Sequence, residues 1–153
     1  MSNRKLSAMK PSDGIVWITG ASSGIGAAVA LEMANRGWQV AISARSRDKL
    51  DKIAELHSNI TAIACDVTDR DGMSKTAQKI EAEIGSLAII IANAGIYLPT
   101  NLPKFDVSIF DDSFAVNLTG TVNMIAASYP YMIERNKGQI VLVSSVAGYN
   151  GLP

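Results

Sequence analysis

Three glycines follow a short apolar run near the start of the chain, in the stretch Thr19-Gly20-Ala21-Ser22-Ser23-Gly24-Ile25-Gly26. A turn from a strand into a helix must be tight here, so Gly20 stands where a side chain would collide. Gly24 lets the backbone approach a pyrophosphate, and Gly26 lets the helix pack closely on the sheet. Free amides and the positive end of the helix dipole then face the diphosphate. An ordinary glycine-rich turn is the alternative, but the position between a strand and a helix favours diphosphate binding.

The elements that must position this turn alternate along the chain. Short apolar runs predict buried strands at residues 15–19, 40–43, 61–64, 87–91 and 140–143, with helical patterns between them. Alternating strands and crossover helices indicate an α/β fold with a parallel sheet and right-handed connections. Ligands of such sheets bind beyond the carboxyl ends of the strands, so functional residues are expected there.

The helical periodicity also predicts which faces are buried. In the helix after the glycine turn, Ile25, Val29 and Met33 recur every fourth residue and are expected to face inward. Thr68 and Asp71 resemble a capping box at the start of the third helix. A long helix is predicted from Asp112 to about Arg135, with an inner face made of Phe114, Leu118, Val122, Ile125, Tyr129 and Ile133.

Composition restricts the class of protein. The 153 residues are 48% apolar, which predicts one folded domain over residues 1–153 and excludes a disordered chain. Fourteen basic residues balance 14 acidic ones, which argues against nucleic acid or an anionic membrane as the partner.

No signal peptide is predicted, and the longest apolar run, Leu87 to Ala92, is too short to span a bilayer. The single cysteine, Cys65, fits a reducing cytoplasm, and the single histidine, His57, has no ligand-spaced partner for a metal site.

Five motifs in order resemble the short-chain dehydrogenase/reductase family. The glycine stretch fits T-G-x-x-x-G-x-G, and it is followed by Asp66, by Asn93-Ala94-Gly95, by Asn117 and by Ser144-Ser145. This resemblance implies a Rossmann-type doubly wound sheet with strand order 3-2-1-4-5, whose later strands are missing from this chain. It also implies a set of cofactor-binding residues: Gly20, Ser22, Ser23, Gly24, Ile25, Gly26, Asp66, Val67, Asn93, Ala94 and Gly95. In the family, the aspartate takes the adenine amino group, and the N-A-G turn supports the sheet beside the cofactor.

The end of the second predicted strand bears on the choice of cofactor. An NAD enzyme commonly places Asp or Glu there to hold the two ribose hydroxyls, whereas this chain has Ala44 followed by Arg45. A guanidinium can bind a 2′-phosphate through a charge-assisted fork, and no carboxylate would repel it. We therefore expect NADP(H) rather than NAD(H). The alternative is that Arg45 is a solvated loop residue that pairs with Asp48.

The resemblance further implies hydride transfer between NADP(H) and a small carbonyl or alcohol substrate. Ser145 would then position the substrate oxygen, and Asn117 would hold a water in the proton relay. The alternatives without a catalytic role are that Ser145 is simply the residue at the end of a strand, and that the Asn117 side chain serves as a cap or a bridging group within the core.

The family also has a Y-x-x-x-K pair downstream of the serine, and no tyrosine of this chain has a lysine four residues later. We therefore expect this chain to be a fragment that is inactive alone, and we expect the complete protein to be a homo-oligomer. A non-catalytic, cofactor-binding regulatory domain is the alternative function.

Overall fold

The computed structural model describes residues 8–99 and 102–148, and its centre is a parallel sheet of five strands. The strands are β1 (Ile15–Thr19), β2 (Gln39–Ala44), β3 (Ile60–Ala64), β4 (Leu87–Ala92) and β5 (Gln139–Leu142). Their order in the sheet is β3-β2-β1-β4-β5, with every neighbouring pair parallel. The α/β Rossmann-type sheet with strand order 3-2-1-4-5 is thus confirmed, and each strand lies within one residue of its predicted bounds.

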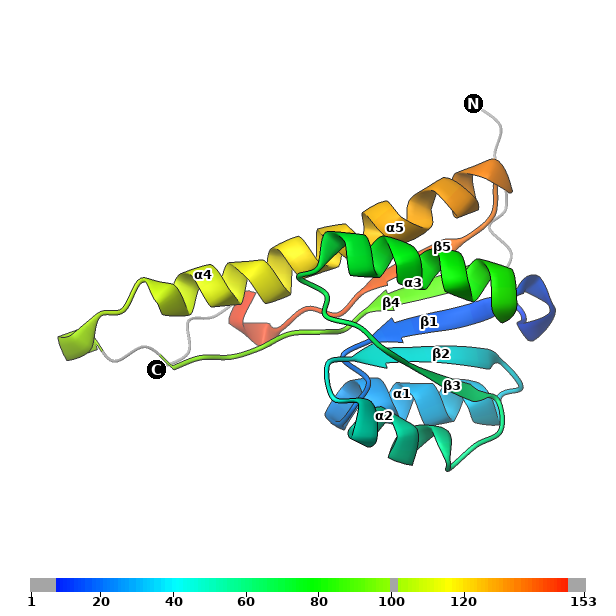
Figure 1. The fold of residues 1–153 in the computed structure, drawn as a ribbon, viewed down its shortest axis with the longest axis horizontal. Coiled ribbons are helices and arrows are strands. Elements are labelled where there is room, and N and C mark those ends of the chain that lie inside the picture. Colours follow the sequence, from blue (N-terminus) through cyan, green and yellow to red (C-terminus); the bar gives the residue numbers. More distant parts are fainter. Residues whose placement is uncertain (1–7, 100–101, 149–153) are drawn as a thin grey trace.

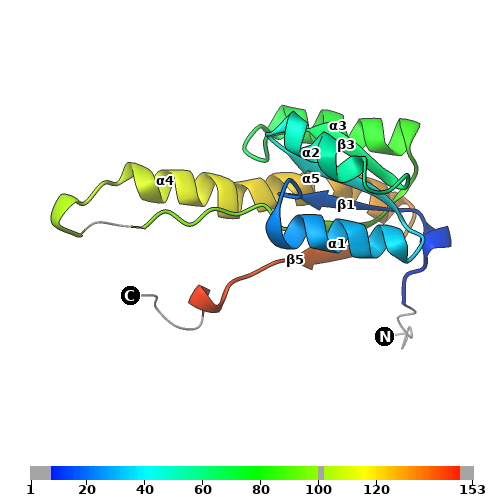
Figure 2. The same cartoon turned by 90° about the horizontal axis from the view of Figure 1, so that it is seen from below.

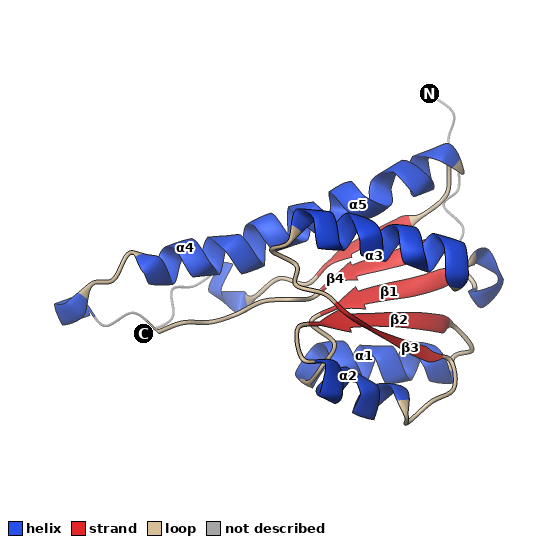
Figure 3. Cartoon of the chain, viewed as in Figure 1, coloured by secondary structure: helices blue, strands red, loops and turns tan. Residues whose placement is uncertain are grey.

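Helices cover both faces of the sheet (Figure 1). They are α1 (Gly24–Asn35), α2 (Arg47–Ala54), α3 (Arg70–Glu83), α4 (Ser108–Phe114) and α5 (Gly120–Glu134). A π-helical segment, Ala115–Thr119, joins α4 to α5, so the two run as one long rod. Single 3-10 turns lie at Pro11–Asp13, Leu102–Lys104 and Val146–Gly148 (Figure 3). Figure 2 shows α1 on the opposite side of the sheet from α3 and α5.

Two hydrophobic cores result from the alternation of side chains along β1. Ile15 and Trp17 point into the core that α3 and α5 cover, while Val16 and Ile18 point into the core that α1 and α2 cover. All five residues of β1 are buried, as expected for a central strand with helices on both faces. The buried indole N–H of Trp17 has a hydrogen-bond partner, because its Nε1 donates to the Ser43 hydroxyl on β2, 2.9 Å away.

The predicted inner face of α1 is confirmed only in part. Val29 and Met33 are partly buried and pack against the core, whereas Ile25 is 65% exposed. The buried residues of α1 are instead small: Gly26, Ala27, Ala30 and Ala34. Small side chains let the helix axis approach the sheet closely, so the large apolar residues Val29 and Met33 lie at the margin of the contact rather than at its centre.

The predicted inner face of the long helix is wrong for most of its residues. Five of its six residues are 49–60% exposed: Phe114, Leu118, Val122, Tyr129 and Ile133. The face against the sheet and α3 carries smaller and partly polar residues, namely Gly120, Asn123, Met124, Ala127, Ser128 and Met132. A stripe of large apolar side chains therefore lies on the outer face of the rod.

The start of α3 differs from the predicted capping box. Its N-cap is Asp69, whose Oδ1 accepts a hydrogen bond from the Gly72 amide at 3.0 Å. The hydroxyl of Thr68 donates instead to Asp66 Oδ1 at 2.9 Å. Thr68 is thus part of the loop that holds Asp66, and Asp71 lies in the first turn of the helix, where its negative charge suits the dipole.

Candidate functional site

The candidate site lies at the carboxyl edge of the sheet, where the loops after the strands meet. The turns that follow β1 and β4 are linked directly by the Asn93 side chain, whose Nδ2 donates to the carbonyls of Thr19 (3.0 Å) and Gly20 (3.2 Å). The Thr19 hydroxyl in turn accepts from the amides of Asn93 and Ala94, both at 3.3 Å. The glycine turn and the N-A-G turn therefore form one hydrogen-bonded unit.

Two of the three glycines are required by the packing of this unit. A Cβ on Gly20, whose φ is +67°, would lie 2.6 Å from Ala94 Cα. A Cβ on Gly26 would lie 2.5 Å from Asn93 Nδ2 and 2.6 Å from the Gly20 carbonyl oxygen. Any side chain at either position would push the β1 and β4 turns apart.

Gly24 is different, because a Cβ there would meet nothing within 4 Å. Its φ of +56° is still one that glycine adopts most readily. Ser23 is the N-cap of α1, yet its side chain makes no capping hydrogen bond. No side chain of the described residues therefore caps the first amides of α1, and the space beside Gly24 is open, an arrangement that suits an anionic group.

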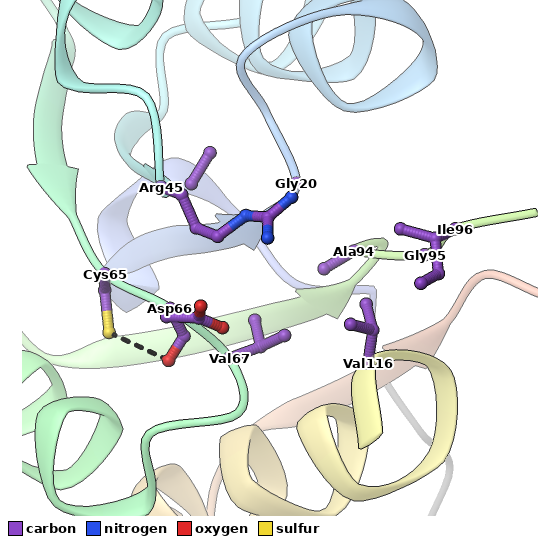
Figure 4. Close-up of a pocket in the computed structure, with 10 residues that line it drawn as sticks. Gly20, Arg45, Cys65, Asp66, Val67, Ala94, Gly95, Ile96 and Val116 are labelled. Atoms are coloured by element: carbon purple, nitrogen blue, oxygen red, sulfur yellow. Dashed lines mark hydrogen bonds between the residues drawn. The ribbon is translucent and has the colours of Figure 1, made fainter. Parts of the chain in front are cut away.

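A pocket runs from the end of β2 to the N-A-G turn (Figure 4). Its lining comes from the loops after β1, β2, β3 and β4 and from the π-helical segment: Gly20, Ala44, Arg45, Cys65, Asp66, Val67, Ala94, Gly95, Ile96 and Val116. The exposed Arg45 side chain extends across this pocket toward Gly20. Within residues 8–99 and 102–148 Arg45 makes no ion pair, and the neighbouring Arg47 is the residue that pairs within α2, with Asp51 at 2.8 Å.

Asp66 lies half-buried at the floor of the same pocket. Its Oδ1 accepts from both the amide and the hydroxyl of Thr68, each at 2.9 Å. None of the described residues donates to Oδ2, and none accepts from the Val67 amide. The loop therefore presents a carboxylate acceptor next to a backbone donor.

A second pocket begins on the other side of the N-A-G turn. It is lined by Ile25, Asn93, Ala94, Gly95, Ile96, Tyr97, Asn117, Thr121, Val143, Ser144 and Ser145. Ser145 is exposed, and its Oγ accepts from the Ala147 amide at 3.2 Å. Because the oxygen is the acceptor in that bond, the hydroxyl proton of Ser145 is left for another partner. The two pockets share Ala94, Gly95 and Ile96. Most of the predicted site residues line one or both of them: Gly20, Ile25, Arg45, Asp66, Val67, Asn93, Ala94, Gly95, Asn117 and Ser145. The other four predicted residues, Ser22, Ser23, Gly24 and Gly26, line neither pocket.

The side chain of Asn117 is already engaged within the protein. Its Oδ1 accepts from the Ile96 amide at 2.8 Å, and its Nδ2 donates to the Ile96 carbonyl at 3.0 Å. The main-chain carbonyl of Asn117 accepts from the Thr121 hydroxyl at 2.9 Å. Asn117 lies in the π-helical segment, and such widened turns are frequent at functional sites. Its amide therefore fixes the strand-end backbone between the two pockets.

Comparison with known proteins decides the family. The family model for short chain dehydrogenases matches residues 14–153, which is nearly the whole chain. The chain belongs to the short-chain dehydrogenase family. This family of oxidoreductases is the one that the five motifs resemble.

Individual members of the short-chain dehydrogenase family differ in how much of them this chain covers. Glycine betaine reductase of Emericella nidulans is 36% identical over 140 residues, 89% of this chain and 11% of the reductase. An uncharacterized oxidoreductase of Staphylococcus saprophyticus is 30% identical over 142 residues, 90% of this chain and 61% of that protein. The solved structure of ElxO with NADP bound matches with a TM-score of 0.84 and 33% identity, over 95% of this chain and 59% of that chain. This chain thus spans less than two thirds of the length of these relatives.

Neither a metal site nor a membrane-spanning helix is found in the described part of the chain. Residues 8–99 and 102–148 contain no group of three or more His, Cys, Asp or Glu side chains placed to hold a metal ion. None of the helices they form is long and apolar enough to cross a membrane.

Sequence reasoning missed a pair of residues behind the site. The buried Asn123 on α5 contacts Arg70 on α3 and the Val67 carbonyl in the β3–α3 loop. These contacts join segments more than 50 positions apart, so no local motif marks them. The sequence signal that could have identified Asn123 is its polar side chain, on the side of the long helix opposite the apolar stripe.

Proposed function

We propose that the chain is the nucleotide-binding part of an NADP(H)-dependent oxidoreductase that acts on a small carbonyl or alcohol substrate. Residues 1–153 would form its single dinucleotide-binding domain, and the lone Cys65 fits a cytoplasmic enzyme. The observation that carries the proposal is the pocket in which Arg45 faces the glycine turn, with no carboxylate at the end of β2. When bound, the nicotinamide ring donates or accepts the hydride; the protein residues bind and orient the reactants.

The diphosphate fits the start of α1. Gly24 has open space where a Cβ would stand, and the uncapped amides of the first helical turn provide donors and a partial positive charge. Ser22 and Ser23 precede these amides and supply hydroxyl donors on the same loop. These features support the assignment of Gly20 to Gly26 as the diphosphate-binding turn.

The 2′-phosphate fits Arg45. Its guanidinium reaches across the pocket and has no acidic partner among the described residues, so it is available to an anion. A charged hydrogen bond contributes roughly 1.5–3 kcal/mol, or about ten- to a hundredfold in affinity. The NADP bound to ElxO, whose fold this chain shares, is consistent with this assignment.

The adenine fits the loop after β3. The Watson–Crick edge of adenine carries an amino donor next to a ring-nitrogen acceptor. The free oxygen of Asp66 and the amide of Val67 offer the complementary acceptor and donor. Val116 and Ala94 line the same pocket and provide apolar surface for the base.

The reacting end of the site lies in the second pocket. The hydroxyl of Ser145 can donate its proton to the substrate oxygen, because the bond from the Ala147 amide uses only a lone pair of the Ser145 oxygen. Asn117 holds the Ile96 backbone at the boundary of the two pockets. A general acid with a pKa near the working pH is also needed for carbonyl reduction, and no tyrosine of this sequence has the Y-x-x-x-K spacing of the family.

Arg45→Asp tests the proposed cofactor. The substitution replaces the 2′-phosphate partner with a carboxylate that suits the ribose hydroxyls of NADH. We expect NADPH affinity to fall about ten- to a hundredfold, with NADH affinity unchanged or higher, in a calorimetric titration. Equal losses for both nucleotides would show that Arg45 does not bind the 2′-phosphate.

Arg47→Gln is the matched control. It removes an exposed positive charge two residues away whose guanidinium is paired with Asp51. Its NADPH affinity should stay close to that of the native protein.

A panel of carbonyl substrates tested with the full-length protein distinguishes an enzyme from the regulatory alternative. The regulatory alternative predicts NADPH binding without turnover.

A further inference from the structure

The β3–α3 loop that carries Asp66 and Val67 is held from behind by α5. The Val67 side chain is buried against Gly120, where an added Cβ would lie 2.6 Å from Val67 Cγ2. The Val67 carbonyl accepts from Asn123 Nδ2 at 2.9 Å. Gly120 and Asn123 lie one helical turn apart, so Val67 is fixed through both its side chain and its main chain by one face of the helix.

The orientation of the Asn123 amide is set by Arg70. Asn123 is 2% exposed, and its Oδ1 accepts from Arg70 Nε at 3.1 Å. A guanidinium can only donate, so the amide oxygen must face Arg70 and the NH₂ group must face Val67. A buried amide satisfied at both ends is rigid, and releasing either end leaves a costly unpaired group.

We propose that Asn123 is a positioning residue for adenine recognition. It lines neither pocket, but it holds the Val67 carbonyl. That carbonyl shares a peptide plane with the Thr68 amide, which donates to Asp66 Oδ1 at 2.9 Å, so Asn123 orients the Asp66 carboxylate and holds the residue that carries the Val67 amide. The inference rests on the proposed function, because it assigns the β3–α3 loop to the adenine of NADPH.

A nucleotide altered only at the base provides the test. In the hypoxanthine analogue of NADPH, an oxo group replaces the adenine amino group and the adjacent ring nitrogen carries a proton. Both polar atoms therefore face the loop with reversed hydrogen-bonding character. The native full-length protein should bind NADPH at least about tenfold more tightly than the analogue.

Two variants disturb the loop through residues that do not themselves line the pocket. Asn123→Asp keeps the shape and the bond from Arg70 but replaces the donor to the Val67 carbonyl with an acceptor. Gly120→Ala displaces the Val67 side chain while favouring the helix, since alanine is the better helix former. For both, calorimetry should show the preference for NADPH over the analogue reduced to within about twofold, because diphosphate and 2′-phosphate contacts are common to the two nucleotides.

Ser128→Ala is the matched control. Ser128 is fully buried on the same helix, and its hydroxyl has no hydrogen-bond partner among the described residues. Its removal should leave the tenfold preference in place. If Ser128→Ala also abolished the preference, general packing of α5 would explain the effect and the positioning role would be refuted.

The remaining outcomes separate the two proposals. If both variants keep the native preference for NADPH over the analogue, the positioning role of Asn123 is overturned while the cofactor assignment stands. If Asn123→Asp does not fold, the result for Gly120→Ala decides whether the positioning role holds. A native protein that binds NADPH without preferring it to the analogue would also overturn the inference. A native protein that binds neither nucleotide would contradict the proposed function itself.

Discussion

At the scale of single residues, two glycines of one turn have different tasks. Both Gly20 and Gly24 have positive φ, so alanine at either costs about 1–2 kcal/mol in backbone strain. Only at Gly20 does the added Cβ also meet backbone, 2.6 Å from Ala94 Cα. The position of Gly20 between strand and helix predicted that a side chain there would collide, and the structure confirms this. The open space beside Gly24 fits the predicted approach of a pyrophosphate.

The two alanine variants should therefore differ in what they damage. We expect Gly20→Ala to lower the free energy of unfolding by about 1–3 kcal/mol more than Gly24→Ala, as measured by urea denaturation. Gly24→Ala should instead weaken NADPH binding, because its Cβ enters the space assigned to the diphosphate. Equal stabilities with equal NADPH affinities would contradict this division.

The reactivity of the native Cys65 thiol can report on the pocket that we propose for adenine, without any substitution. Burial, with a smaller contribution from Asp69 and Asp66, raises the pKa of the Cys65 thiol, against an opposing hydrogen bond with Thr76. Only the thiolate is alkylated, so the rate with iodoacetamide should rise at higher pH in the folded protein than in urea. NADPH should slow the reaction further, because Cys65 lines the pocket. A folded-state midpoint at or below the unfolded one would contradict the assigned environment.

At the scale of elements, the strands were predictable, whereas the buried faces of α1 and α5 were not predicted reliably. Buried parallel strands are continuous apolar runs, so composition alone marks them. Helix faces depend on how close the partner lies: Ala30 and Ala34 pack against the sheet while Ile25 is exposed. Asn123 escaped prediction for a related reason, since its contacts with Arg70 and Val67 exist only after α3 and α5 pack together.

The amino end of β4 provides a test of how these helices are held. Arg135 at the end of α5 donates to both carboxylate oxygens of Glu81 on α3, at 2.9 and 2.7 Å, and to the Leu87 carbonyl. Glu81, whose side chain is 13% exposed, also accepts from the Leu87 amide at 2.8 Å. Arg135→Met leaves this carboxylate without its cation and should cost about 1–3 kcal/mol of unfolding free energy.

Arg36→Met is the control for that measurement. Arg36 pairs with Glu32 one turn away on the same helix, and both side chains are well exposed. Such pairs contribute at most about 0.5 kcal/mol. If chemical denaturation gave equal losses for Arg135→Met and Arg36→Met, the Glu81 cluster would not be what joins α3, α5 and β4.

At the scale of the whole molecule, our proposal assigns nucleotide binding to the described chain but names no residue of this sequence for the acid–base step. Both pockets have walls from the strand ends, yet the Y-x-x-x-K pair that the family uses is absent from the sequence. We therefore expect the purified 153-residue chain to bind NADPH without oxidising it in the presence of carbonyl substrates. Sustained loss of NADPH absorbance with mass-verified protein would contradict this expectation.

The most direct test of the central claim is a calorimetric titration of the native full-length protein with NADPH and with NADH. The amides around Gly24 and the guanidinium of Arg45 predict binding of both nucleotides through the diphosphate, with NADPH about ten- to a hundredfold tighter. Absence of binding by either nucleotide to the folded protein, or a preference for NADH, would contradict the account.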